Sequence, residues 1–325
     1  MANAIKVHSP GGPDCLVYET YDSGQPDRGE VRLSHSAVGL NFIDVYHRTG
    51  LYPIEASPFV PGLEASGTIT ELGTDVTEFS VGDRVAYAGV PIGAYCDERV
   101  IPAHRLVKLP DEISFETGAA MMLQGMTVQY LLRSTYRVKA GDTVVFHAAA
   151  GGVGLIACQW LNQLGATVIG TVGNEEKAAL AKQHGCHHTV LYNEENLLDR
   201  VKEITNGEGV PVVYDSVGKD TYEVSLDCLS PRGLFVSFGS ASGPVESVSP
   251  KDLAAKGSLY FTRPSLMTYT EKREDLLVSA NELIEQVQSG AVNIKIDQTY
   301  PLQEAEQAHR DLESRKTTGS TIFTL

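Results

Sequence analysis

Short apolar runs alternate with glycine and proline turns over about the first 120 residues of this 325-residue chain. The runs include residues 30–33, 65–69 and 84–87, and turns are indicated at residues 10–13, 61–62 and 81–83. Many short strands at such spacing predict an antiparallel sandwich or barrel.

The pattern changes near Ser114. Residues 114–133 contain few helix breakers and carry apolar positions at helical spacing, and Ser114 with Glu116 and Thr117 resembles a helix start. From residue 142 to about residue 262, strands alternate with helical stretches, for example 153–164 and 175–184. This alternation predicts right-handed crossovers and a parallel, doubly wound α/β sheet. The six expected strands are residues 143–147, 167–171, 188–191, 212–214, 233–238 and 258–262.

The segment after residue 263 is too short to form a domain of its own. It predicts a helix at 272–288, a strand at 293–296, a helix at 302–314 and a final strand at 320–324. We therefore expect one domain at residues 1–124, completed by residues 265–325, and a second domain at residues 125–264.

The most informative local pattern joins the first strand of the parallel sheet to its helix. Ala149, Gly151 and Gly154 fit a dinucleotide fingerprint in which alanine replaces the first glycine. The middle glycine lets a pyrophosphate approach the backbone, and the last lets helix and strand pack closely. The free amide groups at the start of the helix attract phosphate. The sequence thus predicts a dinucleotide site here.

The end of the second strand distinguishes the two nicotinamide cofactors. An enzyme that uses NAD usually places an acidic residue there, about 20 residues beyond the fingerprint, to bind the ribose 2′-hydroxyl. Gly173 and Asn174 occupy that position, and Lys177 follows within reach of a 2′-phosphate. Glu175 and Glu176 add opposing negative charge, but on a helix they can point away from Lys177. The pattern favours NADPH.

Charge and cysteine usage exclude several classes of protein. The net charge of −15 makes a nucleic acid or an anionic membrane surface a poor partner. No run approaches the roughly 20 apolar residues that span a bilayer. Five scattered cysteines without a Cys-x-x-Cys pair indicate reduced thiols and a cytoplasmic protein rather than a disulfide framework.

Six motifs along almost the whole chain together resemble one family. The chain resembles the zinc-independent quinone oxidoreductases, the zeta-crystallin-like branch of the medium-chain dehydrogenase/reductase superfamily, and most of all the bacterial NADPH:quinone reductases. The motifs are residues 41–46 (Asn-Phe-Ile-Asp-Val-Tyr), 50–53 (Gly-Leu-Tyr-Pro), 61–67 (Pro-Gly-Leu-Glu-Ala-Ser-Gly), 147–154 (His-Ala-Ala-Ala-Gly-Gly-Val-Gly), 214–218 (Tyr-Asp-Ser-Val-Gly) and 263–266 (Arg-Pro-Ser-Leu).

This resemblance implies a GroES-like catalytic domain and a Rossmann domain with NADPH in the cleft between them. It implies that residues 42–46 face the nicotinamide and that Tyr192 packs at the adenosine end. The cofactor contacts that it carries over are Asn41, Phe42, Ile43, Asp44, Val45, Tyr46, Tyr130, Gly152, Val153, Gly173, Asn174, Glu175, Glu176, Lys177, Tyr192, Val217, Phe238, Gly239, Ser240, Arg263, Pro264, Ser265, Leu266 and Arg315. From sequence alone, Arg315 is better explained as a cation at a helix end, where the helix dipole favours it.

Zinc ligands of the superfamily are missing. The alcohol dehydrogenases of the superfamily bind catalytic zinc through a cysteine near the position of Asn41 and a histidine in a Gly-His-Glu sequence, where this chain has Leu63. Leucine cannot bind a metal. The four-cysteine lobe for structural zinc is also absent, because residues 89–105 contain only Cys96. We expect no metal.

Without zinc as a Lewis acid, oxidation of an alcohol is disfavoured, whereas a quinone already accepts electrons readily. We expect the reaction NADPH + quinone → NADP⁺ + reduced quinone, with Asn41, Tyr46 and Tyr52 orienting the acceptor oxygen. The alternatives are reduction of α,β-unsaturated carbonyls, with selection near Tyr46, Tyr52 and Gln124, and an NADPH-binding protein that is not a catalyst. The resemblance also implies a homodimer. The strand expected at residues 258–262 is apolar and lies at an edge, and pairing with its symmetry mate would cover exposed backbone groups.

Overall fold

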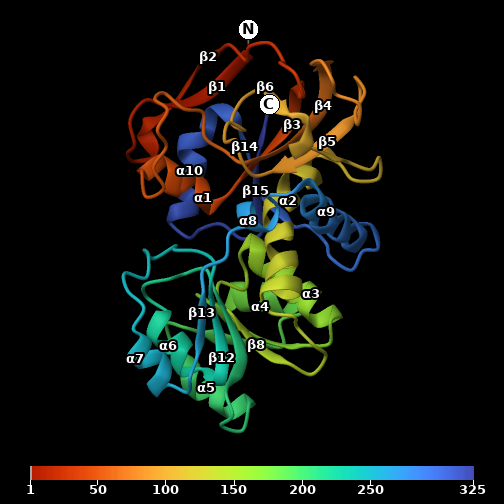
Figure 1. Ribbon diagram of the computed structural model, residues 1–325. Coiled ribbons are helices and arrows are strands. Elements are labelled where there is room, and N and C mark those ends of the chain that lie inside the picture. The colour runs from red at the N-terminus through yellow and green to blue at the C-terminus, as the bar shows by residue number, and fades with distance from the viewer. Residues whose placement is uncertain (1) are drawn as a thin grey trace. The chain divides into compact units, whose positions relative to one another are not determined.

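A computed structural model describes residues 2–325, which form two compact units (Figure 1). Of the described residues, the first contains those up to 126, 270–288 and 294–325, and the second contains 127–269 and 289–293. The segment after residue 269 therefore belongs mostly to the first unit. Helix α2 (Phe115–Tyr130) continues from one unit into the other at Met126.

The first unit is built on a seven-stranded sheet in the order β14-β15-β3-β4-β5-β7, with β6 paired to β3. Its strands are antiparallel except for the pair β14 and β15. A separate hairpin joins β1 to β2. The strands are β1 (Ala2–Val7), β2 (Leu16–Tyr21), β3 (Glu30–Leu40), β4 (Glu64–Leu72), β5 (Arg84–Ala88), β6 (Glu98–Pro102), β7 (Val107–Lys108), β14 (Ile296–Pro301) and β15 (Ser320–Thr324).

The C-terminal segment completes this sheet, since β15 pairs with β3 from Thr321 opposite Leu40 to Thr324 opposite Ala37. The apolar core under the sheet includes Val31, Leu33 and Phe323, none of which is more than 1% exposed. The helices of this unit are α1 (Phe42–Thr49), most of α2, α9 (Arg273–Gln288) and α10 (Ala305–Glu313).

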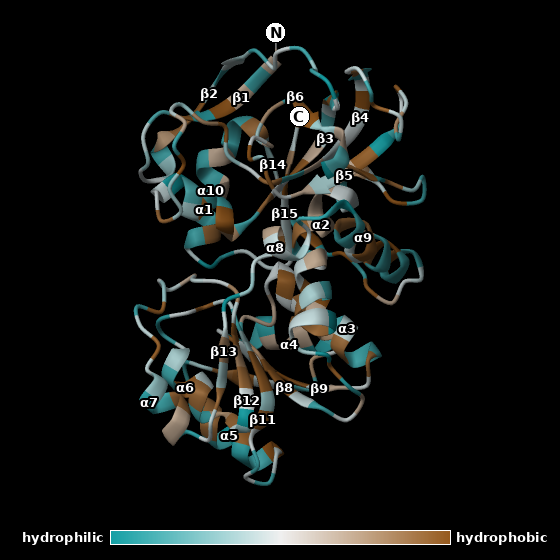
Figure 2. Ribbon diagram, in the orientation of Figure 1, coloured by the Kyte–Doolittle hydropathy of each residue, from teal (hydrophilic) through white to brown (hydrophobic). Residues whose placement is uncertain are grey.

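The second unit has the predicted parallel sheet, in the order β10-β9-β8-β11-β12-β13. This order is the one in which two halves wind outward from the first strand, as in dinucleotide-binding folds. The strands are rich in valine and isoleucine and appear brown in Figure 2, as expected of a sheet covered on both faces. They are β8 (Thr143–Phe146), β9 (Thr167–Val172), β10 (His188–Leu191), β11 (Val210–Asp215), β12 (Leu229–Ser237) and β13 (Tyr260–Thr262).

Helices cover both faces of the parallel sheet. One face packs on α5 and α6 through Leu197, Val201 and Leu226, while α3 and α4 pack on β9 and lie on the other side (Figure 1). The helices of the unit are α3 (Gly152–Gln163), α4 (Glu175–Gln183), α5 (Leu197–Ile204), α6 (Tyr222–Asp227), α7 (Pro250–Ala255) and α8 (Leu266–Tyr269).

Most predicted elements differ from the structure by one to a few residues at their bounds, and three of these differences are informative. The strand predicted at 293–296 is wrong, because β14 begins at Ile296 and runs through polar residues to Pro301. An edge strand paired on one side can be polar, so its apolar pattern is weak. The helix predicted at 302–314 starts with a 3₁₀ turn at Leu302–Glu304. The helix predicted to reach residue 133 ends at Tyr130 and continues as a π turn, Leu131–Thr135.

Candidate cofactor and substrate site

The glycine-rich turn of the second unit joins β8 to α3. Gly151 caps α3, whose first-turn amide groups, including those of Gly152 and Val153, have no partner within the helix. A Cβ atom on Gly154 would lie 2.4 Å from the carbonyl oxygen of Ala148, so only glycine permits this packing. The turn therefore presents a helix N-terminus to an anion.

The tip of β9 brings together the residues predicted for the adenosine end. Asn174 caps α4, because its Oδ1 accepts a hydrogen bond from the backbone amide of Lys177 at 2.9 Å. A Cβ atom on Gly173 would lie 2.8 Å from the hydroxyl of Tyr192, so this ring lies against the tip. Asn193 donates to the carbonyl of Gly173 at 3.1 Å and ties the two strand ends together.

The charged side chains at the tip of β9 differ in their exposure to solvent. Glu175 and Glu176 are exposed in the first turn of α4, whereas Lys177 is half-buried. The side chain where an acid would bind a ribose is the amide of Asn174, and it is already used as the helix cap. The tip thus offers a cation and no acceptor carboxylate at the strand end.

Asp215 organises the predicted residues at the ends of β11 and β12. Its buried carboxylate accepts hydrogen bonds from the amides of Val217 and Gly218 at 2.8 and 2.9 Å. It also accepts from the hydroxyls of Thr221 and Ser225, so every lone pair faces a donor. The sequence showed Asp215 only as part of a motif, and the structure shows that it shapes the turn.

The second strand end lies close to this turn. A Cβ atom on Gly239 would lie 2.6 Å from the carbonyl oxygen of Ser216, and the amide of Phe238 donates to the carbonyl of Asp215. Ser240 follows, half-buried. Val217, Phe238, Gly239 and Ser240 therefore share one edge of the parallel sheet.

The remaining predicted residues of this unit lie around α8. Tyr130 is buried and stacks on Tyr269 with 4.5 Å between ring centroids and 10° between planes. Pro264 and Leu266 are buried, while Arg263 and Ser265 are exposed. The stack joins the end of α2 to the end of α8.

In the first unit, α1 carries an aromatic cluster. The ring of Tyr46 lies 5.7 Å from that of Phe42 and 5.1 Å from that of Tyr52, edge to face. The amide of Tyr52 donates to the carbonyl of Tyr46, which holds the loop against the helix. Tyr46 is buried and Tyr52 is half-buried, so the cluster forms an aromatic wall with polar hydroxyl groups. Ile43 is half-buried beside it and Val45 is buried.

Asn41 precedes α1 and is buried. Its Nδ2 donates to Oε2 of Glu64 at 2.6 Å, and its Oδ1 accepts from Nε2 of Gln124 at 3.1 Å. Glu64 is fully buried, and burial raises its pKa to about 8. Asn41 is therefore held on two sides by buried polar groups.

Asp44 points into the interior of the first unit. Its Oδ2 accepts from the backbone amide of Asn41 at 2.9 Å and from the hydroxyl of Tyr95 at 3.0 Å. Burial raises its pKa to about 7. Gly62, with φ of +94°, leaves room for the ring of Tyr95, because a Cβ atom there would lie 2.3 Å from Cδ1 of that ring.

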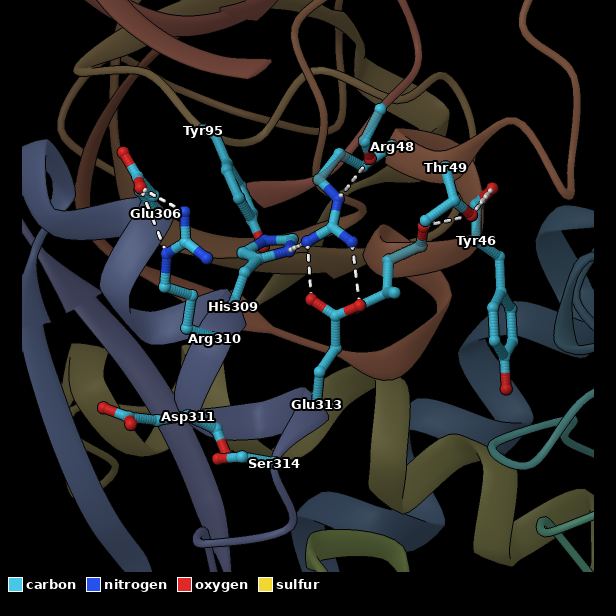
Figure 3. A network of polar contacts seen from close by, with 12 residues as sticks. Tyr46, Arg48, Thr49, Tyr95, Glu306, His309, Arg310, Asp311, Glu313 and Ser314 are labelled. Carbon is cyan, nitrogen blue, oxygen red and sulfur yellow. Dashed lines mark hydrogen bonds and ion pairs between the residues drawn. The ribbon is translucent and has the colours of Figure 1, made fainter. Parts of the chain in front are cut away.

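A second buried network lies between α1 and α10 (Figure 3). The hydroxyl of Tyr95 is 3.1 Å from Nε2 of His309, and Nδ1 of His309 is 3.2 Å from Nη1 of Arg48. Glu313 accepts two hydrogen bonds from Arg48 at 2.8 and 2.9 Å. Tyr46 is turned away from these groups (Figure 3). Arg315 follows α10, exposed and with φ of +59°.

Sequence reasoning missed Glu64, Tyr95, Arg48, His309 and Glu313 as parts of polar networks. A local signal exists only for Glu64, a charged residue at the start of an apolar strand. The others are far apart in sequence, and His309 with Glu313 shows ordinary helical spacing. Their contacts depend on the fold.

The part of the chain that the structure describes contains neither a metal-binding cluster nor a membrane-spanning helix. Within residues 2–325, no group of three or more histidine, cysteine, aspartate or glutamate side chains could hold a metal ion. In the same range, every helix is too short or too polar to cross a membrane.

The fold and the glycine-rich turn define the class of two-domain nicotinamide dehydrogenases, and comparisons narrow it. A family model described as "Alcohol dehydrogenase GroES-like domain" matches residues 27–111, and one described as "Zinc-binding dehydrogenase" matches residues 152–277. A quinone oxidoreductase of Pseudomonas aeruginosa is 52% identical over 99% of both chains. The chain belongs to the quinone oxidoreductase family.

Two further relatives are informative. The crystal structure of Escherichia coli quinone oxidoreductase complexed with NADPH aligns with a TM-score of 0.98 at 48% identity, covering 99% of this chain and all of the other. A 2-haloacrylate reductase of a Burkholderia species is 45% identical over 99% of both chains.

Proposed function

We propose that this protein reduces quinones with NADPH, without zinc. The observation that carries the proposal is the tip of β9, where Asn174 caps α4 and Lys177 lies in the first turn. It is supported by the likeness to a quinone oxidoreductase complexed with NADPH. The balanced reaction is NADPH + H⁺ + quinone → NADP⁺ + hydroquinone.

The residues of the second unit fit this cofactor. The start of α3 offers amide donors for a pyrophosphate, and the half-buried Lys177 offers a cation for a 2′-phosphate. The residue at the strand end itself is Asn174, an amide rather than a carboxylate, and its oxygen caps α4. Tyr192 supplies an aromatic face for an adenine beside Gly173.

When bound, NADPH supplies a hydride, and the protein's own residues position the acceptor. Tyr46 and Tyr52 provide an aromatic wall with hydroxyl donors, and Asn41 provides an amide held in place by Glu64 and Gln124. Holding reactants in a reacting geometry can supply several kcal/mol of the barrier, about 7–11 in the best cases. We assign no general acid.

The proposal that zinc takes no part rests on the side chains at the ligand positions. Asn41 donates its amide to Glu64, and Leu63 is fully buried in the apolar core. Neither offers a thiolate or an imidazole to a metal. Equal activity with and without a chelator is the expected result.

A second candidate reaction is reduction of an activated carbon–carbon double bond. The 45% identical 2-haloacrylate reductase favours it, since the match covers 99% of both chains. In that reaction the same hydride would go to the β-carbon of an unsaturated acid or carbonyl, the carbon–carbon π bond would break, and a proton from water would go to the α-carbon.

We also propose a cytoplasmic homodimer. Its five cysteines are all free thiols, in keeping with a reducing compartment. β13 is the last strand of the parallel sheet, and Tyr260 on it is 61% exposed. Pairing with a second copy would cover this edge. Light scattering tests this, and a monomer at micromolar concentration would contradict it.

The test of the main proposal is oxidation of NADPH followed optically with 1,4-benzoquinone, in parallel with NADH and with a 2-haloacrylate. Turnover with quinone and preference for NADPH are expected. Lys177→Ala should reduce the preference for NADPH over NADH about tenfold or more, because a charge-assisted contact to a phosphate is lost. Binding of NADPH without turnover of any acceptor would contradict the enzymatic proposal.

A further inference from the structure

Four buried polar side chains of the first unit form a continuous string. Asn41 donates to Glu64 at 2.6 Å, Gln124 donates to Asn41 at 3.1 Å, and Ser320 donates to Oε1 of Gln124 at 2.9 Å. All four side chains belong to residues that are at most 7% exposed. The string begins at α1 and β4, passes through α2 and ends on β15.

Backbone groups terminate the string at both ends. The amide of Leu123 donates to Oε1 of Glu64 at 2.7 Å, and the hydroxyl of Ser320 lies 3.2 Å from the carbonyl oxygen of Ala120. Both are on α2. Because every position is buried, these side chains depend on one another and on the backbone of α2 for hydrogen-bond partners. The second N–H of Asn41 is not used within the string.

The string can run in either direction. An amide side chain that turns over exchanges its oxygen and nitrogen at nearly the same positions. With Glu64 ionised, hydrogen bonds point toward it, from Ser320 through Gln124 and Asn41. With Glu64 protonated, its O–H donates to Oδ1 of Asn41, and Nδ2 of Asn41 donates to Oε1 of Gln124.

The reversed string is also satisfied at its far end. Nε2 of Gln124 then donates to Oγ of Ser320, and the hydroxyl of Ser320 donates to the carbonyl oxygen of Ala120, which is already within 3.2 Å. A carbonyl oxygen accepts two hydrogen bonds, so its helical bond is kept. Both states keep the three hydrogen bonds between the four side chains, and the protonated state adds the one from Ser320 to Ala120.

The surroundings of Glu64 keep both protonation states accessible. Burial is the main cause of its raised pKa of about 8, and the carboxyl of Asp44 raises this pKa as well. Hydrogen bonds from the amides of Leu123 and Met122 and from the side chain of Asn41 lower it. The hydroxyl of Tyr95 donates a hydrogen bond to Asp44, and the charge of Glu64 contributes to the raised pKa of Tyr95. On the β3 side stands Gly39, which has no side chain. None of these groups carries a positive charge.

We propose that protonation of Glu64 sets the direction of this string and thereby decides on which side Asn41 presents its amide donor. Glu64 is in this sense a positioning residue for the acceptor oxygen. The inference rests on the proposed function, in which Asn41 orients the acceptor.

The decisive variant is Glu64→Gln. In this variant, Oε1 of the new side chain accepts from Leu123 while its Nε2 donates to Oδ1 of Asn41, which reproduces the protonated direction without a titrating group. We expect kcat/KM of the wild type to titrate above neutral pH by about fivefold, the factor that one neutral hydrogen bond supplies. The variant should stay, at every pH, at the low-pH plateau of the wild type.

The matched control is Glu98→Gln, the same exchange on β6 of the same unit, where the carboxylate is half-buried and contacts Ser23 and Arg32. This control should keep the wild-type profile. Persistence of the titration in Glu64→Gln would overturn the proposal, because the kinetic group would then lie elsewhere.

Infrared spectroscopy of the protein without substrate separates this proposal from the proposed function. The carbonyl band of the protonated Glu64 carboxyl, taken as the difference between the spectra of the wild type and Glu64→Gln, should disappear between about pH 6 and about pH 10. The band that remains in Glu64→Gln belongs to Asp44, whose pKa burial raises to about 7. Side-chain amide signals of Asn41 and Gln124 should shift in nuclear magnetic resonance spectra with the same midpoint. A Glu64 that keeps one protonation state throughout this range would overturn the proposal, even if quinone reduction is confirmed. If no quinone is reduced, these spectra still decide about Glu64.

Discussion

Nη1 of Arg48 lies 3.2 Å from Nδ1 of His309, and this contact fixes the proton of the imidazole ring. A guanidinium group only donates, so Nδ1 must accept and the ring hydrogen is on Nε2. Nε2 then donates to the oxygen of Tyr95, whose own hydrogen goes to Asp44. The direction of every hydrogen bond from Arg48 to Asp44 follows from one cation.

The direction of these hydrogen bonds predicts how substitutions of His309 affect the free energy of unfolding. His309→Gln keeps an acceptor toward Arg48 and a donor toward Tyr95, so it should cost about 1 kcal/mol of unfolding free energy. His309→Ala leaves both partners buried and unsatisfied and should cost about 2–4 kcal/mol. Urea unfolding measures both variants. Equal losses would show that the ring contributes packing rather than hydrogen bonds.

The ion pair of Arg48 and Glu313 predicts an asymmetric response. Arg48 is 1% exposed, whereas one third of the Glu313 side chain is exposed. Glu313→Ala strands a buried guanidinium and should destabilise the protein by about 2–4 kcal/mol. Arg48→Met leaves a carboxylate that water can reach and should cost less. A larger loss for Arg48→Met in urea unfolding would contradict this account.

Buried acids make stability depend on pH. The pKa values of Asp44 and Glu64 are raised by burial to about 7 and about 8, so their contribution is complete below about pH 4 and is lost as the pH rises through those values. The pKa values of His35 and His309 are lowered by burial to about 3, so their contribution is lost as the pH falls below about 6.5.

Between about pH 6.5 and about pH 8 the two acids account for most of the change in protonation on unfolding among these four groups, because the histidines of the unfolded chain are at most half protonated there. The free energy of unfolding should therefore fall across this window, by up to about 1.4 kcal/mol per pH unit for each proton released. Glu64→Gln should remove part of the fall. Denaturant unfolding at several pH values measures it, and a slope unchanged in the variant would mean that Glu64 does not titrate there.

Two glycines of the cofactor unit predict different costs for an added methyl group. In Gly154→Ala the new atom meets the backbone of Ala148 at 2.4 Å, so α3 must shift. The variant should lose about 1–3 kcal/mol and bind NADPH more weakly. In Gly173→Ala the neighbour is the hydroxyl of Tyr192, which is 47% exposed and can move, so stability should change by less than about 0.5 kcal/mol. Equal effects in thermal melts and NADPH titrations would contradict the close packing at Gly154.

Much of the fold could be predicted because its signals are local. The six strands of the parallel sheet were predicted from apolar runs between helices, and the structure contains the expected six-stranded parallel sheet. Ser114 was predicted to start a helix, and its Oγ accepts from the amide of Thr117. The strand at 293–296 was misplaced because β14 is a polar edge strand, whose pattern reflects pairing rather than burial.

The residues of the candidate site also fall into two groups, those that local sequence predicts and those whose partners only the fold reveals. Gly154 and Asn174 could be found because a turn and a helix cap are decided by neighbouring residues. Glu64 and Gln124 could not be recognised as partners of Asn41, since they are 23 and 83 residues away along the chain. Nothing in their local sequence indicates that they share one buried string.

The sequence by itself determined the doubly wound sheet and the position of its dinucleotide turn, because these depend on periodicity and on single glycines. It also determined which side chains stand at the positions where the alcohol dehydrogenases of the superfamily bind zinc, because this depends only on residue type. Only the tertiary structure decided which polar groups share a buried environment. Burial fixes the pKa values of Asp44 and Glu64, and contacts over long sequence separations, such as Arg48 with His309, fix the direction of the hydrogen bonds. Both arise only when distant segments pack together and exclude water.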